Sequence, residues 1–218
     1  MGEVWRYFRD HQSDVLHWTW STVWLAGIPL LVGLAISLPI GWFASRFRWT
    51  YPPVVWSAGI LYTIPSLVLF IVLPGILGTT ILDPINVAVA LTVYTVALLV
   101  RVVADGLTSV SRDTLSAAAA MGYTGRQRLF AVQLPIAIPV IGAGVRVAAV
   151  SNVSLVSVAS IIGVPQLGQL FVAGNNNNSV TPIILGLIVI IALALIFDAL
   201  IVTTVRLMTP WRRAVAGR

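Results

Sequence analysis

Five stretches of the chain are apolar almost without interruption. They cover roughly residues 22–44, 54–73, 85–103, 136–164 and 182–205. A helix needs ~20 mostly apolar residues to cross the hydrocarbon core of a bilayer, because no water is present there to bond exposed backbone groups. The pattern therefore predicts an all-α, polytopic membrane protein with about five transmembrane helices. The fourth stretch is long enough to tilt or to break near its end.

The arginines between these stretches predict an orientation, because basic residues in short loops are retained on the cytoplasmic side. Arginines follow the first, third and fifth stretches, whereas the alternate connections contain none. We therefore expect the N-terminus outside and the C-terminus in the cytoplasm. The predicted parts are an external or interfacial segment at 1–21, a single transmembrane domain at 22–208 and a cytoplasmic tail at 209–218. The arginines in question are Arg46, Arg48, Arg112, Arg126, Arg128, Arg206, Arg212, Arg213 and Arg218.

Composition narrows the function classes. Hydrophobic residues make up 58% of the chain and charged residues only 9%, which is unlike a soluble domain. The arginines lie between apolar runs and do not cluster with exposed aromatics, so no nucleic-acid partner is expected. Cysteine is absent, which excludes disulfides and thiolate sites, and both histidines, His11 and His17, precede the first stretch. We expect no catalytic residue, no metal site and no bound cofactor, and an intramembrane hydrolase is disfavoured.

The polar segments are too small to hold a further domain. Residues 1–17 mix Arg6 and Arg9 with three acidic residues and lack a small-residue cleavage site, so no cleaved signal peptide is expected. No polar block approaches the ~100 residues of a nucleotide-binding or solute-binding domain. Any energy source or solute receptor is therefore expected on other chains. The asparagine run at 175–178 is expected to be a solvated external turn.

The connection at 109–135 differs from the others, because it predicts two short helices joined by a turn. Asp113 can cap the first helix, and the alanines of 117–120 are strong helix formers. Gly122 stands where a helix end favours a residue that tolerates left-handed backbone angles. A second helix is predicted to start at Thr124. The remaining signals are its capping-box partner Gln127 and a closing proline, Pro135.

A family resemblance rests on this connection. The chain reads Ser116-Ala117-Ala118, three residues, Gly122, nine residues, then Val132-Gln133-Leu134-Pro135. This resembles the EAA loop of bacterial ABC importer permeases, in which the pattern is EAA, three residues, Gly, nine residues, I-x-L-P. The spacing matches at every step, and two positions depart from the pattern. Val132 is conservative, whereas Ser116 removes a carboxylate that in the family can pair with a basic residue on the ATPase.

The resemblance implies a type I, MetI-like permease whose connection 109–135 is a coupling helix seated in a separate ATPase. It further implies two ATPase subunits that carry ATP and Mg, a second permease subunit that is identical or related, and an external solute-binding protein at a bacterial inner membrane. The coupling residues it assigns are Ser116, Ala117, Ala118, Gly122, Arg126, Arg128, Leu134 and Pro135. The small residues permit close backbone approach, and the two arginines can engage an acidic rim or anionic lipid head groups. An amphipathic loop lying on the membrane surface is the alternative.

Two further motifs resemble the permeases of osmoprotectant importers. They are residues 62–67, read YTIPSL, and 161–170, read IIGVPQLGQL. The resemblance implies a substrate of the glycine betaine, carnitine, choline or proline class. An ion-coupled secondary transporter or channel is the alternative function. It would be expected to show inverted repeats or several ionisable groups at midplane, and it leaves the two-helix connection unexplained.

Arg146 and Asp198 are ionisable residues within predicted spans, at comparable depths. Such groups are costly in a bilayer and usually face protein or water. We expect them to pair and to hold the fourth and fifth spans together. A proton or cation relay is the alternative reading.

A solute path has weaker signals. Serines recur every three residues at Ser151, Ser154, Ser157 and Ser160, a spacing that advances around a helix, so part of the stripe is expected to pack and part, with Asn152, to line a path. Pro65 is the favoured position for a broken gate, although a simple packing kink is the alternative. The path or gate candidates are Pro65, Ser66, Asn152, Ser154 and Ser157.

Overall fold

The protein is a helical bundle in a computed structural model that describes residues 2–47 and 49–211. Every regular element in these residues is a helix, which confirms the predicted all-α class. Arg48, Arg212, Arg213 and Arg218, which supported the orientation, lie outside the described residues. The elements are α1 Gly2–Asp10, α2 Gln12–Arg46, α3 Tyr51–Thr63, α4 Ser66–Leu77, α5 Pro84–Thr108, α6 Arg112–Ala120, α7 Gly125–Arg128, a π turn Leu129–Gln133, α8 Leu134–Val158, a 3-10 turn Ala159–Ile162, α9 Gln169–Asn176 and α10 Val180–Met208.

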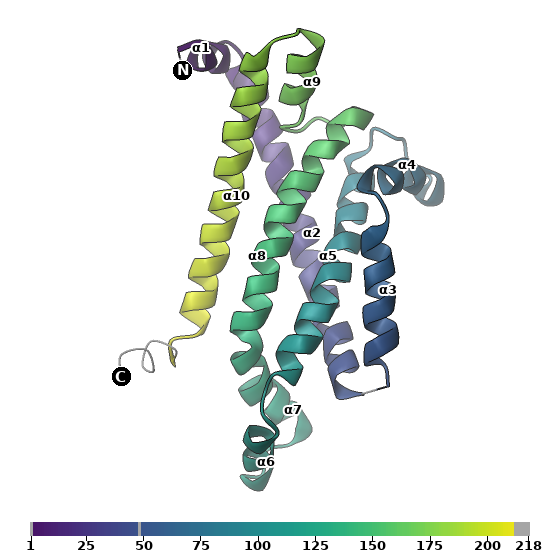
Figure 1. The fold of residues 1–218 in the computed structure, drawn as a ribbon, viewed down its shortest axis with the longest axis vertical. Coiled ribbons are helices and arrows are strands. Elements are labelled where there is room, and N and C mark those ends of the chain that lie inside the picture. The colour runs from purple at the N-terminus through teal and green to yellow at the C-terminus, as the bar shows by residue number, and fades with distance from the viewer. Residues whose placement is uncertain (1, 48, 212–218) are drawn as a thin grey trace.

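Four of the described helical segments are long and apolar enough to cross a membrane. They are α2, α5, α10 and the continuous segment Gly125–Ile162, which joins α7 to α8. Figure 1 shows α1, α4 and α9 gathered at one end of the bundle and α6 and α7 at the opposite end. The short helices therefore mark the two ends of the bundle, and the long helices connect them.

The centre of the bundle depends on close contact between α2 and α5. Gly33 and Gly41 lie on the face of α2 that meets α5. A Cβ at Gly33 would lie 2.5 Å from Thr95 Cγ2, and one at Gly41 would lie 2.7 Å from Val103 Cβ. Ser37, between the two glycines, is fully buried and donates its hydroxyl proton to the Gly33 carbonyl. This is the small-residue packing that lets membrane helices approach closely.

Helix α8 also packs closely through glycines, on two of its sides. A Cβ at Gly144 would lie 2.5 Å from Val102 Cγ1 of α5, and one at Gly142 would lie 2.4 Å from Val205 Cγ2 of α10. Buried apolar residues of α2, α5 and α8, such as Leu30, Leu99 and Ala148, fill the space between these contacts. The three helices therefore form the rigid centre, and α10 packs on it through α8.

The second predicted span, 54–73, is wrong as a continuous helix. The chain breaks between α3 and α4 at Ile64 and Pro65, and the two helices are bent by 98°. Proline has no N–H to donate and disfavours a helical conformation at the preceding residue. Ile64 is accordingly extended, with φ −66° and ψ 129°, and its carbonyl accepts a hydrogen bond from the Tyr94 hydroxyl of α5. With 13 residues, α3 is only about 20 Å long, shorter than the ~30 Å hydrocarbon core.

The first span begins earlier than predicted. Helix α2 starts at Gln12 and not at residue 22, and α1 is the only separate helix before it. Val15 is buried in the core cluster that also contains Leu170 and Leu185, whereas the polar residues around it stay exposed. The first three turns of α2 are amphipathic and not uniformly apolar, because protein covers only one of their faces. A search for continuous apolar runs therefore does not detect them. Whether residues 1–21 lie outside the cell stays a prediction.

A matched pair of single-methyl substitutions tests the packing of α2 on α5. Gly41→Ala places a Cβ 2.7 Å from the Val103 Cβ, whereas nothing lies within 4 Å of a Cβ at Gly59 on α3. Overpacking lowers the free energy of unfolding by about 1–3 kcal/mol, whereas the higher helix propensity of alanine raises it by at most ~1 kcal/mol. We expect Gly41→Ala to lower the free energy of unfolding in detergent and Gly59→Ala not to lower it. Equal stability of the two variants would contradict the close contact.

Candidate functional site

The segment between α5 and α8 projects from one end of the bundle (Figure 1). Its first helix, α6, begins after Ser111, whose side chain accepts a hydrogen bond from the Thr114 N–H at 3.2 Å. The predicted cap, Asp113, is wrong, because it lies inside the first turn. Its carboxylate there still favours the helix, since it faces the positive end of the helix dipole. Ser111 was the better candidate, because an N-cap residue precedes the helix in an extended conformation.

The predicted glycine turn is confirmed. Gly122 has φ +86°, in the left-handed region. The Tyr123 N–H bonds to the Ala118 carbonyl at 3.1 Å, and the Gly122 N–H bonds to the Ala119 carbonyl at 3.0 Å. These two bonds form a Schellman motif, which satisfies the last carbonyls of α6. A Cβ at Gly122 would meet no atom within 4 Å, so the backbone angle, and not the space, requires glycine here.

The second helix starts as predicted. Thr124 caps α7, and the capping box with Gln127 is complete: the Gln127 N–H bonds to Thr124 Oγ1 at 3.4 Å and Gln127 Oε1 accepts from the Thr124 N–H at 2.8 Å. Two backbone donors are thus satisfied at a helix start that is fully exposed to solvent. The turn between α6 and α7 is therefore fixed by local hydrogen bonds at both of its ends.

Pro135 does not close this segment, contrary to the prediction. The chain continues from α7 into α8 through a π turn, in which the Leu134 N–H bonds to the Leu129 carbonyl five residues earlier. Pro135 is in the first turn of α8, where its missing N–H and its ring are accommodated by the wider turn. As a result, α7 and α8 form one uninterrupted rod, Gly125–Ile162.

The coupling residues divide into an exposed and a supporting group. Ser116, Ala117, Gly122 and Arg126 are exposed, whereas Ala118 is buried and Arg128, Leu134 and Pro135 are partly buried. Sequence reasoning missed two exposed neighbours at the tip. Met121 is 70% exposed and Tyr123 is 38% exposed, and both lie beside the small residues. Both side chains add exposed apolar surface to the tip, and the methionine side chain is flexible and adapts to neighbouring groups.

The predicted pair of Arg146 and Asp198 is confirmed as a contact. Arg146 Nε donates to Asp198 Oδ1 at 2.6 Å, and Nη2 donates to Oδ2 at 2.9 Å. This bidentate geometry is the strongest form of an ion pair, because two parallel bonds fix the orientation. The pair joins α8 to α10 about one turn along α8 and two turns along α10 from the close contact of Gly142 with Val205. The two helices are therefore held by packing at one level and by charge at the next.

The path candidates lie in different parts of the bundle. Asn152 is 2% exposed, and its Nδ2 lies 3.0 Å from Thr95 Oγ1 and 3.3 Å from the Ala26 carbonyl, so its amide ties α8 to α5 and α2. Ser157 lines an open hollow of about 500 Å³ with Phe171 and Asn175. Ser154 is exposed on α8, while Pro65 and Ser66 lie at the break before α4. Helix α4 contacts the end of α8 that carries the serines.

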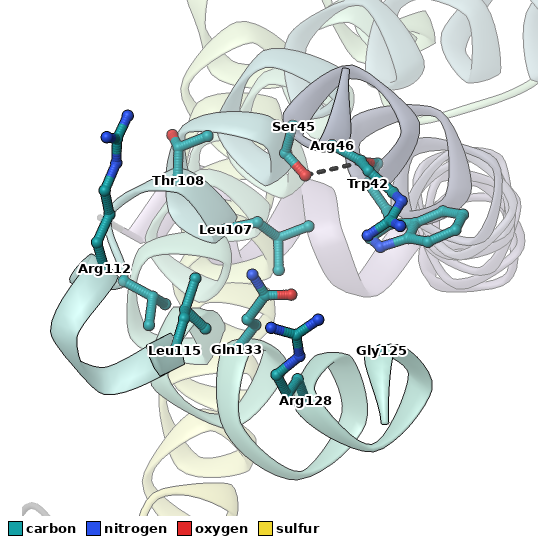
Figure 2. Close-up of a pocket in the computed structure, with 11 residues that line it drawn as sticks. Trp42, Ser45, Arg46, Leu107, Thr108, Arg112, Leu115, Gly125, Arg128 and Gln133 are labelled. Carbon is teal, nitrogen blue, oxygen red and sulfur yellow. Dashed lines mark hydrogen bonds between the residues drawn. The ribbon is translucent and has the colours of Figure 1, made fainter. Parts of the chain in front are cut away.

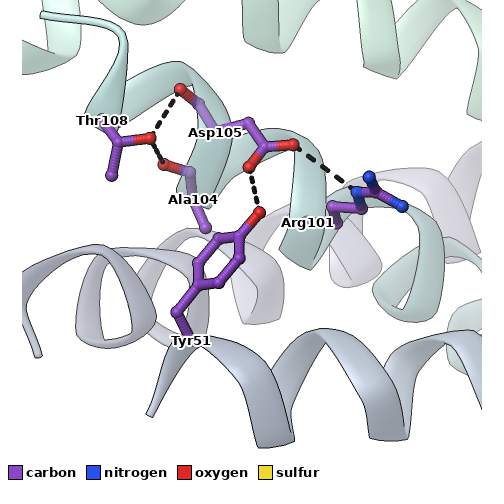
Figure 3. Close-up of polar contacts among 5 residues, drawn as sticks. All are labelled: Tyr51, Arg101, Ala104, Asp105 and Thr108. Atoms are coloured by element: carbon purple, nitrogen blue, oxygen red, sulfur yellow. Dashed lines mark hydrogen bonds and ion pairs between the residues drawn. The ribbon is translucent and has the colours of Figure 1, made fainter. Parts of the chain in front are cut away.

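A polar network that the sequence reading missed ties α3 to α5 (Figure 3). The Tyr51 hydroxyl donates to Asp105 Oδ1 at 2.5 Å, and Arg101 Nε lies 3.6 Å from Asp105 Oδ2. Arg101 was inside the predicted third stretch, and its spacing of four residues to Asp105 is the signal for an ion pair on one helix face. Nothing local connects either residue to Tyr51. Together with the bond from Tyr94 to Ile64, the network holds both ends of α3 on α5.

Comparison with known proteins gives one consistent result. Residues 33–209 match the family model described as binding-protein-dependent transport system inner membrane component. The osmoprotectant import permease protein OsmW of Salmonella typhimurium is 31% identical over 94% of this chain and 96% of that protein. The glycine betaine/carnitine/choline transport system permease protein OpuCB of Bacillus subtilis is 27% identical over 96% and 95%, respectively. In fold, the chain is similar to a chain of the inward-facing MetNI methionine ABC transporter, with a TM-score of 0.83 and 22% identity over 92% of this chain and 98% of the other.

A double-mutant cycle tests the pair between α8 and α10. Asp198→Asn leaves Arg146 without its charge partner, whereas Asp198→Asn combined with Arg146→Gln removes both charges. We expect the melting temperature in detergent to fall further in the Asp198→Asn variant than in the double variant. If the single variant assembles and melts like the wild type, the pair does not hold the two helices.

Removing one hydroxyl tests the network at α3. Tyr51→Phe deletes the bond to Asp105, whereas Tyr123→Phe deletes the same group at the exposed tip of the α6–α7 turn. We expect hydrogen–deuterium exchange of α3 to increase in the Tyr51→Phe variant, because the start of α3 loses its polar contact with α5. Tyr123→Phe serves as the control and should leave α3 unchanged. Identical exchange in both variants would show that the network does not restrain α3.

Proposed function

Because the chain belongs to the family of binding-protein-dependent transport system inner membrane components, we propose that it is the membrane-spanning permease subunit of an ATP-driven importer. The observation that carries this proposal is the two-helix turn of α6 and α7, which projects from the bundle and continues as α8. A push on this turn has no flexible joint to absorb it before it reaches the centre of the bundle.

The partner of the turn is an ATPase subunit. ATP and Mg bind to that subunit, and this chain contributes a contact surface and no catalytic group. Ala117, Gly122 and Met121 present small and apolar groups to a groove, and Ser116 offers a hydroxyl where related permeases carry a carboxylate. Ser116 can donate one hydrogen bond and accept up to two, but it cannot form an ion pair. The contact at this position is therefore a hydrogen bond in place of a salt bridge.

The motion passes from the turn into the spans along defined contacts. Closure of two ATPase subunits on ATP displaces α6 and α7, and α8 moves with them because the backbone is continuous. Asp198 holds α10 to α8 through Arg146, so both helices move together. Two permease subunits, identical or related, enclose the path between them, and the path opens outward to accept solute from an external binding protein and returns inward after hydrolysis.

The proposed solute is an osmoprotectant of the glycine betaine, carnitine or choline class. The names of the similar permeases from Salmonella typhimurium and Bacillus subtilis support this class. The proposed orientation places α6 and α7 in the cytoplasm of a bacterium and α1 and α9 outside. It is supported by four arginines at the end of the bundle that carries α6 and α7, the segment 112–128 that we call the coupling turn. These are Arg46, Arg112, Arg126 and Arg128.

Substitution of the turn glycine tests the coupling role. Gly122→Val forces a β-branched residue into a left-handed conformation, at a cost of about 1–2 kcal/mol or more, and loosens the turn between α6 and α7. We expect membrane insertion to persist while uptake of labelled glycine betaine and retention of the ATPase during purification both fall. Gly59→Val is the control, because Gly59 lies on α3, away from the turn, at an ordinary backbone angle and with nothing within 4 Å of its Cβ position.

Two outcomes would contradict the proposal. One is normal uptake and ATPase retention in the Gly122→Val variant. The other is uptake that continues when ATP hydrolysis is blocked while ion gradients remain, because that result would assign the chain to ion-coupled transport instead.

A further inference from the structure

A cleft separates the end of α2 from the coupling turn (Figure 2). It has a volume of about 500 Å³ and is lined by residues from α2, from the end of α5 and from α6, α7 and the π turn. Its charged lining residues are Arg46, Arg112 and Arg128, and no carboxylate of residues 2–47 and 49–211 lines it. Among the described residues, none of these three arginines forms an ion pair. Positive charge is therefore concentrated here without compensation from the described part of the chain.

The polar groups in the cleft match an anion of phosphate type. Figure 2 shows the Arg128 guanidinium and the Gln133 amide on one side of the cleft and Arg46, with Ser45, on the other. The Ser45 hydroxyl already donates to the Trp42 carbonyl, so the donors that remain are the guanidinium and amide groups. Guanidinium groups bind phosphate oxygens through paired N–H bonds and are the preferred side chains for such anions.

An apolar groove continues from the cleft. The two spaces share Trp42, Arg46, Leu107 and Gly125, and the groove has a volume of about 700 Å³. Leu38 and Phe130 line the groove but not the cleft. Leu38 lies about 12 Å deeper along α2 than Arg46, at ~1.5 Å per helical residue. A free inorganic anion would occupy only the cleft, whereas the combined shape has a cationic head and an apolar extension.

We propose that this combined site binds one anionic phospholipid. The phosphate lies between Arg46 and Arg128 with Gln133 as a further donor, and an acyl chain follows the groove along Leu38 and Phe130. Trp42 lines both spaces, and tryptophan favours the level of the lipid head groups. The proposal rests on the proposed function only for the choice of the cytoplasmic leaflet, in which anionic lipids attract basic segments.

The consequence of this site is a bridge between α2 and the coupling turn. Arg46 belongs to α2, whereas Arg128 and Gln133 belong to the segment that joins α7 to α8. A phosphate bound to both would relieve the repulsion between the arginines and hold the turn at a fixed position relative to α2. The lipid is therefore a structural ligand of the coupling turn, and it contacts neither the path residues nor the exposed tip at Met121.

Native mass spectrometry of the purified chain tests the proposal with phosphatidylglycerol and phosphatidylcholine as probes. The cleft variant combines Arg46→Gln with Arg128→Gln, and the control combines Arg6→Gln with Arg206→Gln, which removes the same charge from exposed positions elsewhere. We expect phosphatidylglycerol binding to weaken about thirty-fold in the cleft variant, the loss that two membrane-proximal basic residues carry. The control, and phosphatidylcholine binding in both variants, should match the wild type.

Further variants separate the lipid from other anions and from misfolding. Phe130→Gln should weaken binding of phosphatidylglycerol, and inorganic phosphate should not displace the bound lipid. Arg46→Lys with Arg128→Lys should restore most of the binding, which a misfolded cleft would not allow. The proposal is overturned if the cleft variant binds phosphatidylglycerol as tightly as the wild type, or if the control loses as much. It is also overturned if inorganic phosphate competes fully with the bound lipid. These measurements use the chain alone, so a failure of the importer proposal would leave their outcome readable.

Discussion

The continuous helical backbone from Gly125 to Ile162 is the constraint on which the rest of the structure depends. Pro135 lies inside this continuous segment, where a proline would normally kink or break the helix, and a flexible joint would then connect the α6–α7 turn to α8. The π turn at Leu129–Gln133 removes this problem, because the Leu134 N–H reaches back five residues instead of four. Turns of this kind recur at functional sites in helices. One continuous helical segment consequently connects the exposed turn to the buried centre of the bundle.

The remaining helices are attached to this rod by contacts of different strength. Helix α5 meets it closely at Gly144 and α10 at Gly142, and the pair of Arg146 and Asp198 adds a charged contact between α8 and α10 at a neighbouring level. The glycine of α3 makes no such close contact, because nothing lies within 4 Å of a Cβ at Gly59. Helix α3 packs on α5, is also held there by the hydrogen bonds from Tyr51 to Asp105 and from Tyr94 to Ile64, and ends in a sharp bend. Helices α5 and α10 thus contact the long segment directly, whereas α3 is attached to the bundle chiefly through α5.

Local signals account for most of what the sequence predicted correctly. The apolar runs predicted the long helices. Residue types within a few positions predicted the left-handed angle at Gly122 and the capping box at Thr124. The pair of Arg146 with Asp198 could be predicted from the sequence, because ionisable residues are rare within membrane spans and usually pair with one another. The break lies at Pro65, the position predicted for a broken helix, but the sequence did not indicate how sharp the bend is, since Pro29 and Pro39 lie inside an intact helix. The Tyr51 network and the arginine cleft join residues far apart in the chain, and no local pattern could indicate them.

Cysteine labelling at the tip of the coupling turn tests the central claim most directly, because the chain contains no cysteine of its own. Met121→Cys places a single thiol on the exposed tip. If the turn is a cytoplasmic lever seated in an ATPase, a membrane-impermeant maleimide should not label the thiol in intact cells. The maleimide should label the thiol in inside-out vesicles that have been stripped of the ATPase. Labelling should be lost again when the ATPase is restored. Labelling in intact cells, or equal labelling with and without the ATPase, would contradict the coupling role of this segment.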